Sequence, residues 1–203
     1  MSAEPIGPIG NHYDKYGSSN RIERWMMDGF LGTLDGMLDG LQPSRVLEVG
    51  VGEGEILQRV AARFPQASTQ GIDLPDDDLA EEWRRRGLTA EFGDATALRF
   101  ADGEFDLVLA IEVLEHIPQP ERALRELARV CRGTVVLSVP FEPVWRAGNM
   151  ARGRYLKDWG NTPGHVNHWT RWSFAKAVGA HFEVDRVASP VPWTMVRGRV
   201  RAR

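Results

Sequence analysis

Short apolar runs alternate with amphipathic stretches along the middle of the chain. The nearly continuous apolar run FDLVLAIEV (105–113) is typical of a strand that is buried on both faces of a sheet. The same pattern predicts further strands at 45–50, 68–73, 89–92 and 134–140. Helices are predicted between them, near 54–64, 77–86 and 120–131, the last one capped by Gly133. This alternation predicts an α/β fold with a doubly wound, mostly parallel sheet.

The two ends of the chain carry different patterns. Apolar residues recur at helical spacing over residues 20–40, which predicts an N-terminal helix that ends before Pro43. A helix near 171–179 precedes HFEVDRVA and WTMVRGRV, which are predicted to be two strands joined by a turn. We expect them to form an antiparallel pair at the edge of a seven-stranded sheet. Residues 141–169 show no clear periodicity, so the prediction is one domain (1–203) with a helical cap (1–43) and an insertion or lid (141–169).

Composition and charge narrow the class of protein. The chain has 203 residues, 42% of them hydrophobic, without an apolar run long enough to cross a membrane or a secretory signal, so we expect a cytoplasmic protein. Its single cysteine, Cys131, excludes an internal disulfide and a cysteine-based zinc cluster. Residues 1–144 hold 14 basic and 25 acidic side chains, whereas residues 145–203 hold 11 and 3. The acidic part argues against nucleic-acid binding, and the basic part either attracts an anionic partner or surface or neutralises the rest.

A glycine-rich turn, Gly50-Val51-Gly52-Glu53-Gly54, joins the first predicted strand to the next helix. Such turns often bind phosphate at the helix N-terminus, but Glu48, Glu53 and Glu55 surround this one with negative charge. A dinucleotide fingerprint would have glycine at position 55. Asp73 ends the second predicted strand, where a carboxylate can accept hydrogen bonds from ribose hydroxyls. The combination indicates a cationic nucleoside without phosphates, a description that S-adenosylmethionine (SAM) fits.

Four segments in order, E-V-G-V-G-E-G, G-I-D-L, F-G-D-A and F-D-L-V-L-A-I-E-V-L-E-H-I, resemble those of class I SAM-dependent methyltransferases with a Rossmann-like fold. The resemblance implies a cofactor site made of Glu48, Gly50, Gly52, Asp73, Leu74, Asp94, Ala95 and Ile111. In this interpretation Glu48 lies near the methionine end of SAM, Asp73 binds the ribose, and Asp94 faces the adenine. Aromatic residues before the first helix often fold over the cofactor in this family, which points to Tyr16, with Tyr13 and Asn20 as further candidates.

Two polar clusters are candidates for handling the methyl acceptor. Glu112, Glu115 and His116 match an E-x-x-E-H pattern that holds a divalent metal in some methyltransferases, those of ubiquinone biosynthesis and small-RNA 2′-O-methylation. Ligands of this kind suit Mg or Mn, but the pattern is also common in members without a metal, so a metal-free site is favoured. The second cluster contains His165 and His168. We expect His165 and His116 to be catalytic, because a hydroxyl nucleophile needs a base nearby.

The resemblance implies methyl transfer from SAM to a small molecule, and the candidate bases favour oxygen as the acceptor atom. RNA 2′-O-methylation, a non-catalytic SAM-binding module and an NAD(P)-dependent oxidoreductase remain alternatives. The segment after the fifth predicted strand often builds the substrate pocket in this family, so residues 141–169 would lie on the substrate side. Its basic, Trp-rich part, which includes Trp145, Tyr155 and Trp159, has three interpretations: a lid, a peripheral membrane contact, or a grip on an anionic group.

Overall fold

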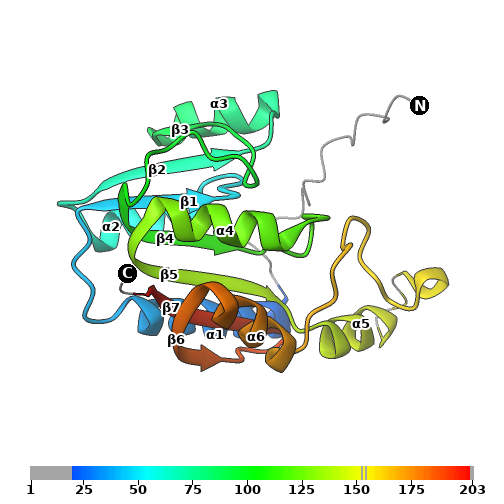
Figure 1. The fold of residues 1–203 in the computed structure, drawn as a ribbon. Coiled ribbons are helices and arrows are strands. Elements are labelled where there is room, and N and C mark those ends of the chain that lie inside the picture. The colour runs from blue at the N-terminus through cyan, green and yellow to red at the C-terminus, as the bar shows by residue number, and fades with distance from the viewer. Residues whose placement is uncertain (1–19, 152, 154, 202–203) are drawn as a thin grey trace, which may run out of the picture.

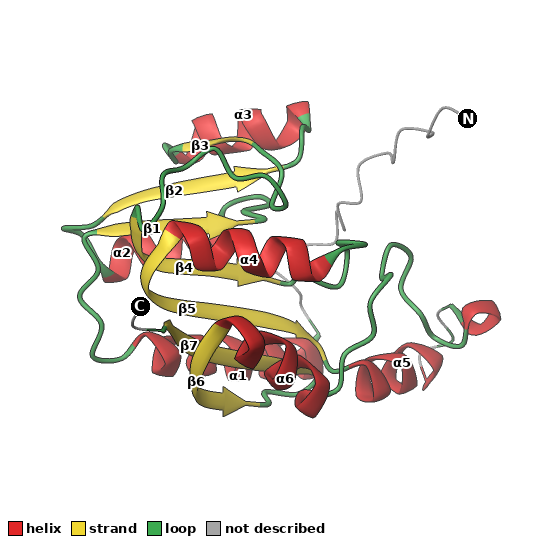
Figure 2. Ribbon diagram, viewed as in Figure 1, coloured by secondary structure: helices red, strands yellow, loops and turns green. Residues whose placement is uncertain are grey.

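The computed structural model describes residues 20–151, 153 and 155–201, and Figures 1 and 2 show their arrangement. Among these residues, seven strands form one sheet in the order β3-β2-β1-β4-β5-β7-β6. The strands are β1 (Arg45–Val49), β2 (Ser68–Asp73), β3 (Ala90–Phe92), β4 (Phe105–Ile111), β5 (Cys131–Pro140), β6 (Phe182–Ala188) and β7 (Trp193–Val200). The helices are α1 (Arg21–Leu38), α2 (Glu55–Arg63), α3 (Asp77–Arg86), α4 (Pro120–Val130), α5 (Glu142–Ala151) and α6 (Arg171–His181), with the short 3₁₀ helix η1 (Leu156–Asp158). The predicted α/β class and seven-stranded sheet are confirmed. Tyr13 and Tyr16 lie outside the described residues.

Helices cover both faces of the sheet because strand side chains alternate between the two faces. Along β4, Leu107 and Leu109 pack in a cluster with residues of α1 and α2, whereas Val108 and Ala110 pack in a cluster with residues of α4 and α6. Figure 1 shows α4 and α6 in front of the sheet, with α1 and α2 behind it. The sheet is therefore the middle layer of three, as the apolar strand pattern predicts.

The strand order reverses beside β1. Strands β1, β2 and β3 run outward in one direction, and the chain then returns to place β4 on the other side of β1. Both pairings of β1 are parallel, so the carboxyl ends of β1 and β4 lie at the same edge. In doubly wound sheets this switch point is where ligands bind. The glycine turn follows β1, and Glu112 follows β4, so both predicted clusters of the site begin here.

The C-terminal strands form the predicted antiparallel pair. Strand β7 inserts between β5 and β6 and is antiparallel to both. Its first residue, Trp193, is in register with Pro140 at the carboxyl end of β5. The C-terminal part of the chain therefore contributes to the edge of the sheet at which β4 and β5 end.

Gly133 does not cap a helix, so that part of the sequence prediction is wrong. Helix α4 ends at Val130, and Cys131 already has extended backbone angles and begins β5. A Cβ atom on Gly133 would lie 2.2 Å from the carbonyl oxygen of Asp106. The β4–β5 register also shifts between Phe105 and Leu107. Glycine at 133 thus allows β4 to approach β5 closely beside this irregularity, and a helix end is not involved.

The insertion at 141–169 contains helix α5, which hydrophobic periodicity did not reveal. The buried residues of α5 are Glu142 and Asn149, both polar, so the helix has no apolar stripe to detect. Its hydrogen bonds run to the following loop: Asn149 Nδ2 donates to the Gly160 carbonyl at 2.9 Å, and Trp145 Nε1 donates to Thr162 Oγ1 at 2.8 Å. Arg146 Nε also donates to the Trp159 carbonyl at 2.9 Å, whereas the Trp159 residue itself is 76% exposed. Across the residues described, the helices lack the length and apolar character that spanning a membrane requires.

Candidate functional site

The glycine turn after β1 has a backbone that only glycine adopts easily. Gly50, Gly52 and Gly54 have φ angles of 74°, 50° and 90°, in the left-handed region. A Cβ on Gly50 would lie 2.3 Å from Val113 Cγ2, and one on Gly54 would lie 2.1 Å from Leu88 Cδ1. A Cβ on Gly52 would meet nothing within 4 Å. Gly50 and Gly54 therefore serve internal packing, whereas Gly52 faces space that a ligand can approach.

The turn is held in place by the end of β2 and by α3. The amides of Gly50 and Val51 donate to the Ile72 carbonyl at 2.8 and 3.0 Å. The amide of Gly52 donates to Asp73 Oδ2 at 2.7 Å, and Trp83 Nε1 donates to the Gly52 carbonyl at 2.7 Å. Because both sides of Gly52 are bonded, the open face of the turn is rigid before any ligand arrives.

Asp73 accepts hydrogen bonds and keeps capacity for more. Its Oδ1 accepts from the Leu74 amide at 2.7 Å, in addition to the Gly52 bond at Oδ2. Burial raises the pKa of this carboxyl, and the two backbone donors partly offset the shift. An ionised carboxylate has about four lone-pair positions, so about two remain for hydroxyl donors. Leu74 beside it is 57% exposed and offers an apolar surface.

Glu48 is a buried acid with one oxygen that lacks a hydrogen bond. It lies inside the sheet on β1, between Gly71 of β2 and Leu109 of β4, and is 2% exposed. Burial, together with the nearby Asp73 charge, raises the pKa of Glu48 well above its usual value, and a backbone hydrogen bond from Leu57 opposes the shift. Its Oε2 has no hydrogen-bond partner. A buried acid of this kind gains most from a cationic ligand, which would stabilise its ionised form.

Glu112 points toward β7 and β5. It has a left-handed φ of 60° at the end of β4, where the backbone turns out of the sheet. Its Oε2 accepts from Trp193 Nε1 at 2.6 Å, and its Oε1 accepts from Ser138 Oγ at 3.3 Å. These two contacts direct its carboxylate to the start of β7. Glu112 is therefore not part of the polar cluster that begins three residues later, at Glu115.

That polar cluster consists of Glu115, His116 and His165, which each offer one ligand atom within 4.8 Å of the others. The two imidazole rings meet edge to face with centroids 5.0 Å apart, and His116 Nε2 lies 3.9 Å from Glu115 Oε1. A fourth residue, Glu142, accepts a hydrogen bond from His165 Nδ1 at 2.8 Å through its Oε1. Glu115, His165 and Glu142 are buried. The structure thus brings His116 and His165 together, as two candidate bases in one place.

The backbone holds this cluster through a clamp between residues 114–117 and 164–167. The amides of Val166 and Asn167 donate to the Glu115 carbonyl at 2.9 and 3.1 Å. Asn167 Nδ2 donates to the carbonyls of Leu114 and Ile117 at 3.0 and 2.6 Å. His116 Nδ1 and the Gly164 carbonyl are 3.0 Å apart. These bonds fix the loop after β4 against the end of the insertion.

Comparison with known proteins agrees with this geometry. Residues 47–138 match a family described as "Methyltransferase domain". The chain is 31% identical over 122 residues to malonyl-[acyl-carrier protein] O-methyltransferase of Geobacter sulfurreducens, a match that covers 58% of this chain and 44% of that protein. It is 40% identical over 105 residues to phosphatidylethanolamine N-methyltransferase of Cereibacter sphaeroides, covering 46% and 49%. The chain spans about half the length of these curated relatives.

A solved structure extends the likeness over most of the fold. The SAM-dependent methyltransferase from Mesorhizobium loti superposes with a TM-score of 0.67 at 20% identity, covering 84% of this chain and 97% of that one. Residues 47–138 therefore carry a methyltransferase domain, and the fold of the chain is shared with a SAM-dependent methyltransferase. The predicted family and its cofactor, SAM, are thereby confirmed.

The cofactor side of the methyltransferase domain fits SAM on two observations. The open face at Gly52 admits the nucleoside, and the unbonded Glu48 Oε2 suits its ammonium group. Another predicted position has a local partner: Asp94 is exposed and accepts from the Thr96 amide and hydroxyl at 2.7 and 2.8 Å, as in an Asx turn. Ile111 ends β4 and is 7% exposed, and Ala95 is partly buried against the core. The roles of these residues toward SAM stay predictions.

Sequence reasoning missed Glu142, and the candidate role of Asn20 beside SAM stays a prediction. Glu142 lies two residues beyond β5, at the edge of the sheet where ligands bind in doubly wound folds. This position after a strand is the feature of the sequence from which Glu142 could have been identified. Asn20 caps α1, because its side chain accepts from the Ile22 amide at 2.9 Å. His168 is exposed and is hydrogen-bonded through Nε2 to Asn161 Oδ1 at 2.9 Å. It therefore lies outside the buried cluster of the methyltransferase domain.

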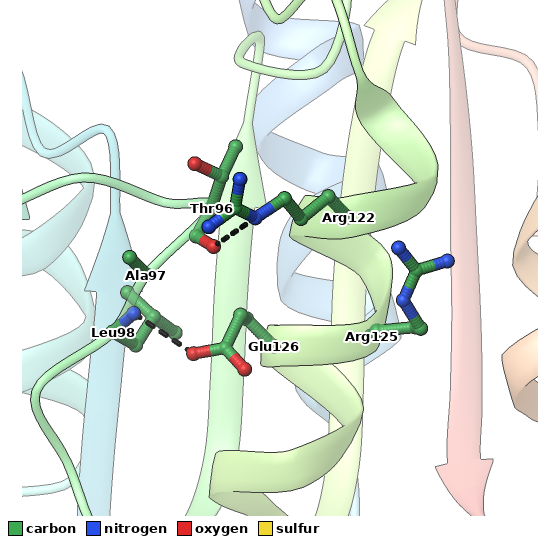
Figure 3. A pocket seen from close by; sticks show the side chains of 6 residues that line it. All are labelled: Thr96, Ala97, Leu98, Arg122, Arg125 and Glu126. Carbon is green, nitrogen blue, oxygen red and sulfur yellow. Dashed lines mark hydrogen bonds between the residues drawn. The ribbon is translucent and has the colours of Figure 1, made fainter.

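A cavity of about 450 Å³ lies between α4 and the loop after β3. Figure 3 shows its polar lining: Arg122 Nε donates to the Thr96 carbonyl at 3.0 Å, and Glu126 accepts from the Leu98 amide at 2.9 Å. None of the predicted site residues lines it. These two bonds join α4 to the backbone of the loop after β3.

Proposed function

We propose that the chain transfers the methyl group of SAM to a hydroxyl oxygen of a small molecule, with His165 as the base and His116 beside it. The observation that carries this proposal is the buried hydrogen bond between Glu142 and His165, at 2.8 Å, next to the loop that follows β4. Methyltransferases that act on oxygen need a group to take the hydroxyl proton, and a carboxylate-oriented imidazole is suited to that task.

The protonation states follow from the hydrogen bonds. The ionised carboxylate of Glu142 accepts only, so His165 Nδ1 carries a proton and its Nε2 holds the lone pair. Bound SAM would supply the methyl group, with S-adenosylhomocysteine as the leaving group, and Nε2 of His165 would take the hydroxyl proton of the acceptor as its oxygen attacks. The Glu142 carboxylate then stabilises the imidazolium that forms. The products are the methyl ether, S-adenosylhomocysteine and a proton.

The other side chains hold the cofactor. When bound, SAM supplies an electrophilic methyl group on a positively charged sulfur. Asp73 would accept from the ribose hydroxyls, while Glu48 would pair with the ammonium group and the Gly52 backbone would lie against the nucleoside. Alignment of the methyl carbon with the acceptor and exclusion of water are the main sources of rate for a direct displacement.

The relatives differ both in the class of their acceptor and in the atom that is methylated. Their printed names include an O-methyltransferase of malonyl-[acyl-carrier protein] and an N-methyltransferase of phosphatidylethanolamine. The choice of oxygen for this chain rests on the histidine base, since a neutral amine does not need a base before it attacks. Glu53 argues against the nicotinamide alternative, because a pyrophosphate at the turn would meet its charge, whereas Glu55 is paired with Arg86.

Calorimetry with SAM and with NADH, followed by a product assay with labelled SAM and a pool of metabolites, tests the proposal. We expect SAM to bind, NADH not to bind, and label to appear in a hydroxylated small molecule. Preferential binding of NADH, or label in nitrogen compounds or RNA, would contradict the proposal. SAM binding without any transfer would indicate the non-catalytic module.

The base is tested by His165→Gln, with His168→Gln as the matched control on the exposed side of the same loop. We expect the first change to lower kcat by roughly 10²–10⁴-fold, which is the usual contribution of a general base. The second should leave kcat within about two-fold, as surface changes do. Equal effects of the two changes would contradict the assignment of His165.

A further inference from the structure

We propose that Thr162 is a positioning residue for the base: helix α5 holds its hydroxyl group, and the tight turn from Thr162 to His165 fixes the imidazole against Glu142. The inference rests on the proposed function, because it concerns the same base. Thr162 is 8% exposed and His165 is 7% exposed, so both are buried beneath the surface of the insertion. The argument runs from α5 to Thr162, and from Thr162 to the two histidines of the polar cluster.

Three residues of α5 lie on one side of the helix and bond to the loop that ends at His165. Glu142, Trp145 and Asn149 are spaced i, i+3 and i+7, which places them one above the other along the helix. Glu142 Oε1 accepts from His165 Nδ1 at 2.8 Å. Trp145 Nε1 and Asn149 Nδ2 donate to Thr162 Oγ1 at 2.8 and 3.2 Å. One helix therefore carries the partner of the base and both donors to the Thr162 hydroxyl.

The Thr162 hydroxyl is held in one place by these two donors. The indole nitrogen of Trp145 can only donate a hydrogen bond. Asn149 Nδ2 also donates to the Gly160 carbonyl at 2.9 Å, which fixes the end of the amide that faces the hydroxyl. Asn149 is 3% exposed, so these bonds lie away from water. Buried bonds are costly to break because the group that loses its partner stays desolvated.

Thr162 and His165 are the first and last residues of a tight turn, Thr162-Pro163-Gly164-His165. The amide of His165 donates to the Thr162 carbonyl at 3.1 Å, and Gly164 has a left-handed φ of 87°. Proline followed by glycine at the two central positions, with a positive φ at the glycine, is the pattern of a type II turn. The first and last Cα atoms of such a turn lie less than about 7 Å apart. A displacement of Thr162 therefore displaces His165 as well.

The same turn also contacts the other histidine. His116 Nδ1 and the Gly164 carbonyl are 3.0 Å apart, and the two imidazole rings meet edge to face with centroids 5.0 Å apart. The indole ring of Trp145 lies on another side of His165, with centroids 6.3 Å apart. A shift of the turn would thus move His165 relative to both Glu142 and His116. A misplacement of about 1 Å in an active site can cost about 10²-fold in rate.

The first test compares two changes at Thr162. Thr162→Val removes the acceptor oxygen and keeps the shape of the side chain, so we expect kcat to fall roughly ten- to a hundred-fold. The KM for SAM and the affinity for S-adenosylhomocysteine should stay the same, because the cofactor turn is a separate segment. Thr162→Ser keeps the hydroxyl and should restore most of the lost rate. Equal losses in the two variants would overturn the role of the hydroxyl.

The second test observes the hydrogen bond between His165 and Glu142 directly, in protein without cofactor or acceptor. Nuclear magnetic resonance of protein labelled with nitrogen-15 at histidine reports which ring nitrogen carries the proton. We expect the proton on His165 Nδ1, with a downfield signal that His165→Gln removes. Thr162→Val should shift or broaden this signal, and Thr162→Ser should retain it. An unchanged signal in Thr162→Val would overturn the proposal.

The third test asks whether the effect passes through Trp145. Trp145→Phe removes the indole donor but keeps an aromatic ring beside His165, and Asn149 still bonds to the hydroxyl, so we expect a smaller loss of kcat than in Thr162→Val. The double variant should be no slower than Thr162→Val alone, because both changes remove the same hydrogen bond. Fully additive losses would overturn the route through Thr162.

Trp172→Phe is the matched control for Trp145→Phe. Trp172 lies on α6 and is 73% exposed, so its replacement should leave kcat and the His165 signal unchanged. Thermal unfolding of every variant shows whether it is folded under the conditions of the assay. Equal effects of Trp172→Phe and Trp145→Phe would contradict a specific role of the indole beside the base.

Failure of this inference can be told apart from failure of the proposed function. A changed His165 signal with an unchanged kcat in Thr162→Val would overturn the role of His165 as the base and leave its positioning by Thr162 intact. A reduced kcat with an unchanged signal would overturn the positioning and leave the base in place. Activity that survives His165→Gln would contradict the proposed function alone, since the signal does not depend on methyl transfer.

Discussion

The amide nitrogen of Gly52 donates a hydrogen bond of 2.7 Å to the carboxylate of Asp73. This bond joins the glycine turn after β1 to the end of β2, two segments that the sequence separates by 21 positions. It means that the residue expected to bind the ribose also holds the turn against which the nucleoside lies. Changes at Asp73 therefore affect both the contact and the shape of the site.

Asp73→Ala is expected to lower the affinity for SAM more than Asp73→Asn does. Alanine removes the hydroxyl acceptor and the support for Gly52, whereas asparagine keeps one oxygen that can accept from the Gly52 amide. The loss of a hydrogen bond to a charged group should weaken binding roughly ten- to a hundred-fold. Calorimetry with S-adenosylhomocysteine, which avoids turnover, gives the affinities. Unchanged affinity in Asp73→Ala would exclude this residue from the ribose site.

Glu48 is expected to make the protein without cofactor less stable as the pH rises. Its pKa is raised well above the usual value by burial, so the folded state binds its proton more tightly than the unfolded state does. The free energy of unfolding should therefore fall as the pH increases from the ordinary pKa to the raised one, and stay constant above it. Glu48→Gln removes this dependence. Urea unfolding of both proteins over a pH series measures it, and parallel curves would contradict the shift.

The same group should make SAM binding depend on pH in the opposite sense. The ionised carboxylate attracts the ammonium of SAM, and the protonated form does not, so affinity should rise with pH through the raised pKa of Glu48. Binding should also release a proton, which calorimetry detects in buffers of different ionisation enthalpy. Glu48→Gln should bind SAM more weakly and without this proton release. Proton release that persists in Glu48→Gln would assign it to another group.

Two glycine changes are expected to separate folding from cofactor binding. In Gly50→Ala the new methyl group would lie 2.3 Å from Val113, in a backbone with a φ of 74°, and we expect a loss of stability of about 2–4 kcal/mol. In Gly52→Ala the methyl group meets open space, so the cost is the left-handed backbone, about 1–2 kcal/mol. SAM affinity should nevertheless fall in Gly52→Ala, since the methyl group projects toward the nucleoside. Thermal unfolding and calorimetry on both variants check the contrast.

The thiol of Cys131 is expected to stay unreactive while the protein is folded. Burial raises its pKa to about 11, and its Sγ donates a hydrogen bond to the Thr134 carbonyl at 3.4 Å. At pH 8 about one thiol in a thousand is then ionised, and reagents also lack access. Labelling with Ellman's reagent should therefore follow global unfolding in urea. Fast labelling of the native protein would contradict the burial of Cys131 at the start of β5.

The cofactor side of the site could be predicted from the sequence because its parts are local. Its residues lie in the last positions of a strand or in the turn just after it, and parallel strands bring those ends to one edge. The turn at Gly50–Gly54 and the acid at Asp73 are therefore placed by the alternation of elements alone. Their functional roles depend on the family resemblance, and the structure adds the bond between Gly52 and Asp73 and the raised pKa values.

The acceptor side could not be predicted in the same way, because its contacts are long-range. His165 and Glu142 are 23 positions apart, His116 and Gly164 are 48 apart, and Glu112 and Trp193 are 81 apart. Helix α5 has polar buried residues, so its pattern resembled a loop. Gly133 was assigned to a helix end because glycine is common at such ends. Here it instead allows two strands to approach closely.

The clamp has a consequence for how the family can change its substrates. Bonds from Asn149 to Gly160 and from Arg146 to Trp159 join helix α5 to the loop that follows it, while Trp145 packs against Trp193 and His165. A segment exchanged between Glu142 and the clamped loop must therefore keep an aromatic residue at 145 if the polar cluster and the cofactor turn are to stay as they are. A chimera that carries the corresponding segment of another methyltransferase between these two fixed points should keep its affinity for SAM and acquire a different choice of acceptor.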